Sequence, residues 1–166
     1  MSARVPMLLG ILASLMTAAL GCHHPPRKPS VAIEVDSLTG IVSITGTSFE
    51  QQLVLRSGAT VTLLSAAAPD SAALSRLGGV EVLVVGRRES NRFRVEHLTA
   101  LSVAGSPVID GVVRNYGDRV VVETPRGPLP LGNPPAGLRA LSGARVWVGG
   151  PLNTGPNTYG VIVPAQ

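Results

Sequence analysis

The chain has 166 residues, of which 14% are charged and only 3% are aromatic, while glycine and proline number 19 and 14. This composition disfavours long solvated helices and favours turn-rich β structure, so we expect an all-β fold. The formal net charge is +4, but three of the 14 basic residues, Arg4, Arg27 and Lys28, lie near the amino terminus. The other 11 stand beside 10 acidic residues, a balance that disfavours nucleic acid as a partner.

The amino-terminal segment is typical of an export signal. Arg4 is followed by an uncharged, leucine-rich run from residue 5 to residue 20. A charged start and an apolar run of this length match a signal peptide, and the apolar centre is short for a membrane-spanning helix. We therefore predict a signal peptide over residues 1–21 and export of the chain.

The signal ends in Ala19-Leu20-Gly21-Cys22, and Cys22 is the only cysteine of the chain. This ending resembles the lipobox of bacterial lipoproteins, although Ala19 stands where that family usually has leucine. The resemblance implies cleavage before Cys22 and acylation of its thiol and new amino group with chains such as palmitate, which anchors a protein to a membrane without spanning it. The alternative is ordinary signal-peptidase cleavage, with Ala19 and Gly21 as the small residues.

Residues 22–30 carry the predicted lipid and then three prolines, which favour a stiff, extended tether between membrane and folded chain. His23 follows the cysteine where an aspartate would signal retention, so resemblance to lipoprotein sorting in bacteria with two membranes favours the outer membrane. Both the periplasmic face and the surface face of the outer membrane are compatible with this signal. His23 and His24 have no third ligand nearby, so we expect plain linker and no metal site.

A pattern of six residues recurs after 64 positions. Leu-x-x-Leu-x-Gly-x-x-Val-x-Val-x-Gly begins at Leu74 and again at Leu138. The leucine pair suits one face of a helical turn, the first glycine suits its end, and the alternating valines suit a strand that faces a core. The repeat predicts two similar folding units, at residues 31–105 and 106–166.

Each unit is expected to contain three strands, a short helix or turn, and two further strands. In the first unit the strands are expected at residues 40–45, 52–56, 60–64, 80–86 and 93–101, with a helix near residues 66–77 capped by Asp70 and a polar connection at residues 87–92. In the second they are expected at residues 111–114, 119–124, 129–131, 144–149 and 159–163, with a single helical turn within residues 134–141.

This order of elements resembles the OB-fold, a five-stranded barrel with a helix between its third and fourth strands. The resemblance implies two tandem OB-like small barrels, each closed on itself. The chain also resembles small OB-like domains of exported bacterial proteins, most of which have no assigned function, so the likeness implies a fold rather than an activity. Units this small are marginal alone, and we expect the two to pack against each other.

Four arginines crowd the hairpin between the fourth and fifth predicted strands: Arg87, Arg88, Arg92 and Arg94. A fork of guanidinium groups at this loop can grip phosphate or carboxylate. Glu89 and Glu96 are interspersed among them, however, and the favoured interpretation is a solvated hairpin whose charges pair with each other.

Trp147 is the only tryptophan and is expected on the strand face opposite the repeat valines. Packing within or between the barrels is the favoured interpretation of so large an apolar side chain, and the alternative is an exposed platform that stacks on a ring-shaped ligand.

No catalytic set emerges from the sequence. Carboxylates such as Asp110 and Asp118 are scattered, and no phosphate loop or dinucleotide fingerprint occurs. We therefore expect no enzyme, no cofactor and no metal. The predicted function is a membrane-anchored, non-catalytic binding or interaction module of the bacterial envelope. Two alternatives are a structural or assembly component that docks to another envelope protein, and an oligosaccharide or anionic-polymer binder that uses the arginine hairpin; the sequence identifies no small-molecule ligand.

Overall fold

The computed structural model describes residues 35–47 and 49–166. The predicted signal peptide, Cys22 and the tether lie outside the described residues. Strands predominate in the described part, which contains ten strands and two short helices and belongs to one compact unit. Neither of these helices has the length and apolar character needed to cross a membrane.

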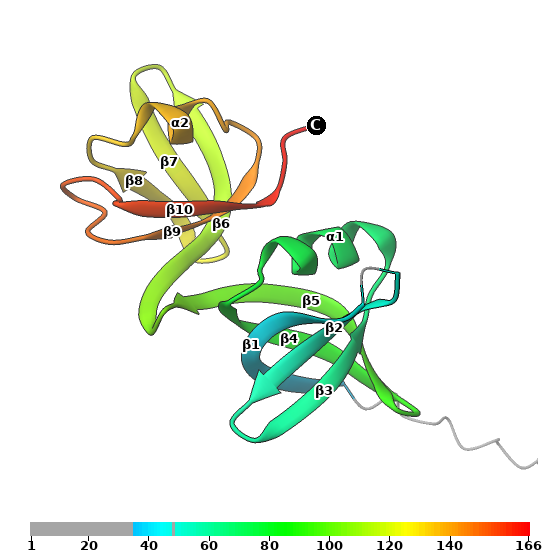
Figure 1. The fold of residues 1–166 in the computed structure, drawn as a ribbon. Helices are drawn as coiled ribbons and strands as arrows, with labels where there is room; N and C mark the ends of the chain where they lie inside the picture. Colours follow the sequence, from blue (N-terminus) through cyan, green and yellow to red (C-terminus); the bar gives the residue numbers. More distant parts are fainter. Residues whose placement is uncertain (1–34, 48) are drawn as a thin grey trace, which may run out of the picture. The chain divides into compact units, whose positions relative to one another are not determined.

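The first five strands close into a barrel (Figure 1). They are β1 (Asp36–Gly46), β2 (Gln51–Ser57), β3 (Thr60–Ser65), β4 (Val80–Glu89) and β5 (Arg92–Val103). β1 pairs with β2 and β4, β2 with β3, and β4 with β5, all antiparallel. A short parallel pairing of β3 with β5, Leu64 opposite Phe93, completes the ring. Closure leaves the small sheet without an open edge.

The helix α1 (Ala68–Arg76) lies between β3 and β4, where the sequence predicts it. The expected cap at Asp70 is wrong, because Ala67 occupies the N-cap and Asp70 lies in the first turn. Pro69 explains the earlier start, since its fixed backbone angle suits the first turn of a helix. Leu74 and Leu77 are fully buried against the barrel, and burial of each leucine stabilises the fold by about 1.5–3 kcal/mol.

Five further strands form a second set: β6 (Ser106–Tyr116), β7 (Arg119–Thr124), β8 (Gly127–Leu131), β9 (Arg145–Gly149) and β10 (Thr158–Val163), with the single-turn helix α2 (Ala136–Arg139) between β8 and β9. Their antiparallel pairings repeat those of the first set: β6 with β7 and β9, β7 with β8, and β9 with β10. The expected closure of β8 on β10 does not occur among these pairings.

Two features explain why the second set stays open. The closing pairs of the first set use the beginning of the 12-residue β5, whereas β10 has only six residues. β8 also contains Pro128 and Pro130, which have no backbone donor for another strand. The loop before β10 partly replaces the missing pairing, because the amide of Gly132 donates to the carbonyl of Leu152 at 2.7 Å.

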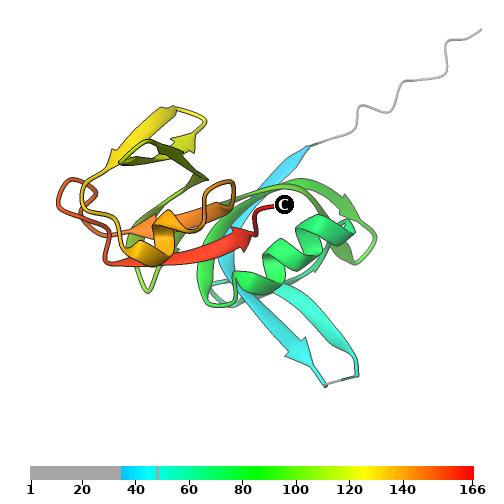
Figure 2. The same ribbon diagram turned by 90° about the horizontal axis from the view of Figure 1, so that it is seen from above.

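Each set has its own buried cluster, and β10 takes part in both. Val82 and Val84 belong to the first cluster, while Val146 and Val148 belong to the second. Ile162 of β10 is fully buried within the first cluster, and β10 contacts α1 (Figures 1 and 2). The core of the closed barrel is therefore completed by a strand of the second set.

A partly buried ion pair also connects the two sets. The carboxylate of Asp110, on β6, is 6% exposed and receives Nε and Nη2 of Arg145, on β9, at 2.7 and 2.8 Å. Asp110 also accepts the amide of Ala100 at 2.8 Å, and Arg145 donates to the carbonyl of Leu98 at 2.6 Å. Because Leu98 and Ala100 belong to β5, these bonds join three strands through one ion pair.

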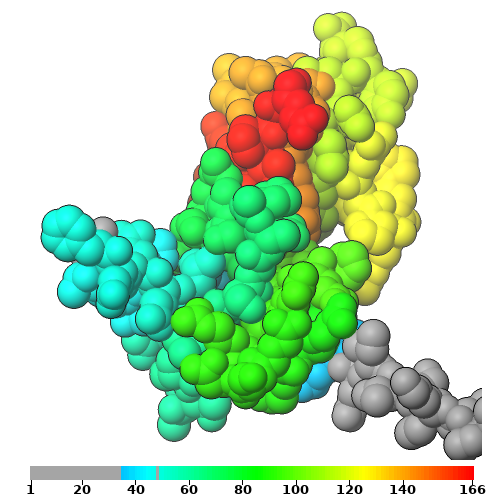
Figure 3. Space-filling model, turned by 90° about the vertical axis from the view of Figure 1, so that its right-hand side faces the viewer, coloured from blue at the N-terminus to red at the C-terminus, as the bar shows by residue number. Residues whose placement is uncertain are grey.

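The hairpin of β1 and β2 projects from the surface (cyan in Figure 3). Phe49, in its turn, is 96% exposed, and Ile44, near the end of β1, is 46% exposed. The amide of Glu50 donates to the carbonyl of Thr47 at 3.2 Å across the turn. The hairpin thus displays an aromatic side chain that no part of the described chain covers.

Candidate functional site

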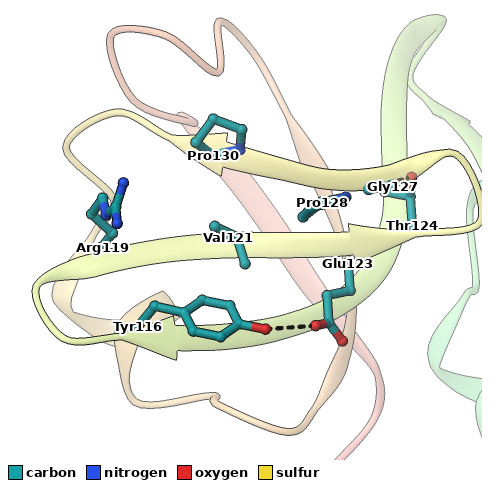
Figure 4. A pocket seen from close by; sticks show the side chains of 8 residues that line it. All are labelled: Tyr116, Arg119, Val121, Glu123, Thr124, Gly127, Pro128 and Pro130. Atoms are coloured by element: carbon teal, nitrogen blue, oxygen red, sulfur yellow. Dashed lines mark hydrogen bonds between the residues drawn. The ribbon is translucent and has the colours of Figure 1, made fainter.

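A shallow hollow of about 540 Å³ lies on the outer face of β6, β7 and β8. We call it the outer-face trough. Figure 4 shows the eight residues that line it: Tyr116, Arg119, Val121, Glu123, Thr124, Gly127, Pro128 and Pro130. They combine one aromatic ring, two proline rings and two opposite charges, which is the mixture of apolar area and a few polar groups that ligand sites use.

Strand alternation places these side chains together. On β7 the buried residues Val120 and Val122 face the core, so Arg119, Val121 and Glu123 must face outward. The register sets Val121 opposite Pro130 of β8, and Glu123 opposite Pro128. The outer face of β7 therefore presents a cation, an apolar side chain and an anion in that order, next to the two proline rings of β8.

Tyr116 is held in place by Glu123. The phenol oxygen donates to Oε1 of Glu123 at 2.9 Å, and Nε of Arg114 donates to Oε2 of the same carboxylate at 3.1 Å (Figure 4 draws the first of these bonds). The hydrogen bonds from Arg114 and Tyr116 lower the pKa of Glu123, and the bond to Glu123 raises the pKa of Tyr116. The site thus presents an ionised carboxylate and a neutral phenol at neutral pH.

The trough offers three kinds of contact at once. The ring of Tyr116 is more than half exposed although its hydroxyl is fixed, so its position is set before any ligand arrives. Arg119 has no carboxylate partner among residues 35–47 and 49–166. A ligand with a flat apolar face, hydroxyl groups and an anionic group would satisfy the ring, Glu123 and Arg119 together.

Three of the four hairpin arginines are paired with carboxylates. Nε of Arg87 donates to Glu96 at 2.8 Å, Arg88 reaches Asp36 at 3.2 Å, and Arg94 reaches Glu89 at 3.4 Å. The bond between Arg87 and Glu96 raises the pKa of the arginine and lowers that of the glutamate. Two of these ion pairs lie within the hairpin, and the third joins the hairpin to Asp36 of β1.

The structure also corrects the expected connection at residues 87–92. β4 extends to Glu89 and β5 begins at Arg92, so only Ser90 and Asn91 form the turn. The ladder continues through Arg87 opposite Arg94 and Glu89 opposite Arg92. The sequence favours a loop there because residues 87–92 are polar at every position, but they continue the two-stranded ribbon of β4 and β5.

Arg92 differs from the other three arginines. It has no ion pair among the described residues and lines a hollow of about 370 Å³ beside the β1–β2 hairpin and α1. Gln51, Gln52, Ser71 and Ser75 lie around the same hollow. Amide and hydroxyl groups beside an unpaired guanidinium can bind a polar ligand. The hollow beside Arg92 is therefore a second candidate ligand site.

Trp147 packs against the buried cluster of the first strand set. Its strand β9 holds it opposite Asp110 on one side and Gly160 on the other, and a side chain at Gly160 would collide with the indole ring. A glycine is needed where the ring crosses the neighbouring strand. This packing explains the tryptophan without a ligand.

The predicted lipidation residue, Cys22, lies outside the described residues. Within residues 35–47 and 49–166 no group of three or more metal-binding side chains occurs. Sequence reasoning missed Tyr116, Arg119 and Glu123, although the alternation of Arg119, Val121 and Glu123 along one strand was a signal. No protein-family model, curated protein or solved structure matches the chain.

Proposed function

We propose that this protein is a non-catalytic binding module, anchored by acyl chains on Cys22 to the envelope of a bacterium, with the outer membrane favoured. The support for the anchor is the signal-like leader, the lipobox-like ending Leu20-Gly21-Cys22 and the absence of any other cysteine. The proline-rich residues 23–30 would then space the strands from the bilayer.

The fold within this proposal is a tandem pair of OB-like units, the second of them open. The support is that four strand pairings recur between the two sets in the same order, each set with a helix between its third and fourth strands. In OB-folds, oligosaccharides and oligonucleotides bind across the second and third strands. The outer-face trough occupies the corresponding strands, β7 and β8.

The ligand class that the trough supports best is an oligosaccharide, with an acidic sugar favoured by Arg119. The observation that carries this choice is the fixed, exposed ring of Tyr116 beside the carboxylate of Glu123. A sugar ring can stack its apolar face on the tyrosine while its hydroxyl groups donate to the carboxylate. Because Arg87, Arg88 and Arg94 are already paired, the trough is favoured over the arginine hairpin as the binding site.

The ligand test is calorimetric titration of the chain with tetramers of galacturonate and of N-acetylglucosamine. We expect Tyr116→Ala to weaken binding at least tenfold, because it removes the stacking surface, while Tyr116→Phe keeps the ring and weakens binding less. Arg92→Gln is the matched control on the hairpin. If Arg92→Gln abolishes binding and Tyr116→Ala does not, the site is the hairpin and the trough proposal fails.

The anchor test is intact-mass spectrometry of the mature chain from a bacterial membrane fraction. We expect an amino-terminal Cys22 carrying acyl chains, and no acylated chain from the Cys22→Ser variant. A mature chain with a free Cys22 thiol would contradict the anchor and leave the ligand question untouched.

A second candidate function, docking to another envelope protein, is favoured by Phe49. An aromatic side chain that is 96% exposed at a hairpin turn is the type of residue that fills a partner pocket and dominates an interface. Crosslinking in intact cells, with a photoreactive residue at position 49 or at position 119, separates the two functions. A protein that crosslinks from position 49 and not from position 119 supports docking. In that case Phe49→Ser should abolish the capture of this partner protein.

A further inference from the structure

A third hollow, of about 490 Å³, opens where β5 and β6 separate. We call it the junction cleft. These strands pair only at Ser102 with Pro107 and at Val103 with Ser106, because β6 then continues along β9. One hydrogen bond replaces the interrupted ladder further along, from the amide of Ala100 to the carboxylate of Asp110. The cleft is therefore a consequence of how the chain changes its pairing partner.

The walls of the junction cleft are largely apolar. Leu101 of β5, Val108 and Ile109 of β6, and Leu129 of β8 line it, and each of them is only partly buried. Apolar side chains that remain accessible in a concave position gain free energy when a ligand covers them. The volume of the cleft falls within the range of small-molecule sites.

Within residues 35–47 and 49–166, the lining of the cleft contains one cation that has no ion pair. Asp110 forms part of the lining, but its carboxylate already accepts two hydrogen bonds from Arg145 and one from Ala100. Arg126 is exposed and has no ion pair within the described part of the chain. A single guanidinium at the edge of an apolar hollow attracts an anionic group.

The turn that carries Arg126 is already fixed. The amide of Arg126 donates to Oγ1 of Thr124 at 3.1 Å, and the same hydroxyl donates to the carbonyl of Gly127 at 2.9 Å. Pro125 precedes Arg126 and restricts the turn further. A backbone ordered before binding reduces the entropy cost of placing the guanidinium on a ligand.

We propose that the junction cleft binds a single-chain anionic amphiphile. Its carboxylate or phosphate head pairs with Arg126, and its alkyl chain, of roughly eight to twelve carbons for a site of this size, lies against Leu101, Val108, Ile109 and Leu129. A small polar anion would leave those walls exposed to water, and a neutral alkyl compound would leave Arg126 unused. This proposal rests neither on the trough nor on the lipid at Cys22.

The test follows the fluorescence of Trp147, the only tryptophan, whose strand position lies directly opposite Asp110. The full chain carries Cys22→Ser, so that no attached acyl chain competes for the cleft. We expect decanoate and decyl phosphate to cause a saturable change, and decanol to bind about tenfold more weakly. The two anionic probes distinguish a fatty acid from a phosphate-headed lipid.

Two matched variants decide the role of the cation. Arg126→Gln should weaken decanoate about tenfold and leave decanol unchanged, so that the two probes bind alike. Arg56→Gln, on β2, removes an exposed arginine that lies outside the cleft and should change neither affinity. Amide chemical shifts should move at residues 99–101 and 108–110 when decanoate binds.

Three results would overturn the proposal. The first is the absence of saturable binding below the concentration at which the probes form micelles. The second is equal affinity for decanoate and decanol in the unaltered cleft, which would remove the role of Arg126. The third is a set of chemical-shift changes centred on Tyr116 and Val121, which would place the amphiphile in the trough.

Discussion

Gly79 and Gly143 occupy equivalent places in two hydrogen-bonded turns, one in each strand set. The amide of Gly79 donates to the carbonyl of Val42 at 2.9 Å, and the amide of Gly143 donates to that of Val113 at 2.8 Å. Their φ angles are +83° and +90°, and both valines are fully buried. Each glycine therefore ends a helical turn and connects it to the first strand of its set.

The first prediction separates backbone strain from packing at two adjacent glycines. A Cβ at Gly78 or at Gly79 would meet nothing within 4 Å, but only Gly79 has a positive φ. Gly79→Ala should lower the free energy of unfolding by about 1–2 kcal/mol, the cost of a left-handed conformation for an L-residue. Gly78→Ala should leave it within about 0.5 kcal/mol. Urea unfolding measures both, and equal effects would contradict the role of φ.

The second prediction concerns the ion pair at the junction. Asp110→Asn keeps the size of the side chain but leaves Arg145 without its counter-charge. Because the Arg145 side chain is 30% exposed, the loss should be about 1–3 kcal/mol, less than for a fully buried pair. Asp118→Asn is the matched control, because Asp118 is exposed and its side chain pairs with nothing in the described chain. Urea unfolding of both variants is the measurement. If Asp110→Asn costs no more than Asp118→Asn, the pair contributes little to stability.

The third prediction is that the two strand sets unfold together. Ile162→Ala should destabilise the chain by about 2–5 kcal/mol, because a cavity then opens in the core of the first set. Ile44→Ala, at a 46% exposed isoleucine, should cost much less. Tryptophan fluorescence and far-ultraviolet circular dichroism should report one coincident urea transition. Two separate transitions would mean that the shared core does not couple the sets.

The fourth prediction concerns pH. Because hydrogen bonds from Arg114 and Tyr116 lower the pKa of Glu123, its contribution to stability is present above the ordinary glutamate pKa and is lost as pH falls through the lowered value. The bond to Glu123 raises the pKa of Tyr116, so that contribution is present below the ordinary tyrosine pKa and is lost as pH rises through the raised value.

The check is a carbon-13 titration of the Glu123 carboxyl group. Tyr116→Phe should move the pKa of Glu123 upward, toward its ordinary value, but not fully to it because Arg114 remains. Tyr159→Phe is the control, since Tyr159 packs against the second cluster and has no hydrogen bond to Glu123. An unchanged pKa in Tyr116→Phe would mean that the phenol does not bind the carboxylate in solution.

Local patterns predicted much of the fold. The bounds of β7, Arg119–Thr124, match the sequence prediction, and the alternating valines of β4 and β9 are buried as expected. Alternation and turn residues act over a few positions, so they can be read along the chain. β8 does not pair with β10 because β10 is short and β8 contains two prolines. A prediction based on the number and order of strands does not include these two features.

The site residues were harder to predict because they meet across strands. Tyr116 and Glu123 come together through the register of β6 with β7, and Asp110 meets Arg145 from a position 35 residues away. Neither pair can be recognised from the pattern of polar and apolar residues along a single strand. The hairpin arginines can be recognised because they are close in sequence, yet three of them pair with carboxylates, and among the described residues Arg92 alone of the four has no ion pair.

The place of Ile162 has a consequence for the order in which the chain can fold. A ribosome, or a channel that passes the chain from its amino end, releases β1 to β5 well before it releases β10, whose side chain completes their core. Until then the core of the barrel lacks the side chain of Ile162. The native fold of a partly emerged chain is therefore less stable than that of the whole chain. Folding would thus be delayed until nearly all of the chain is free.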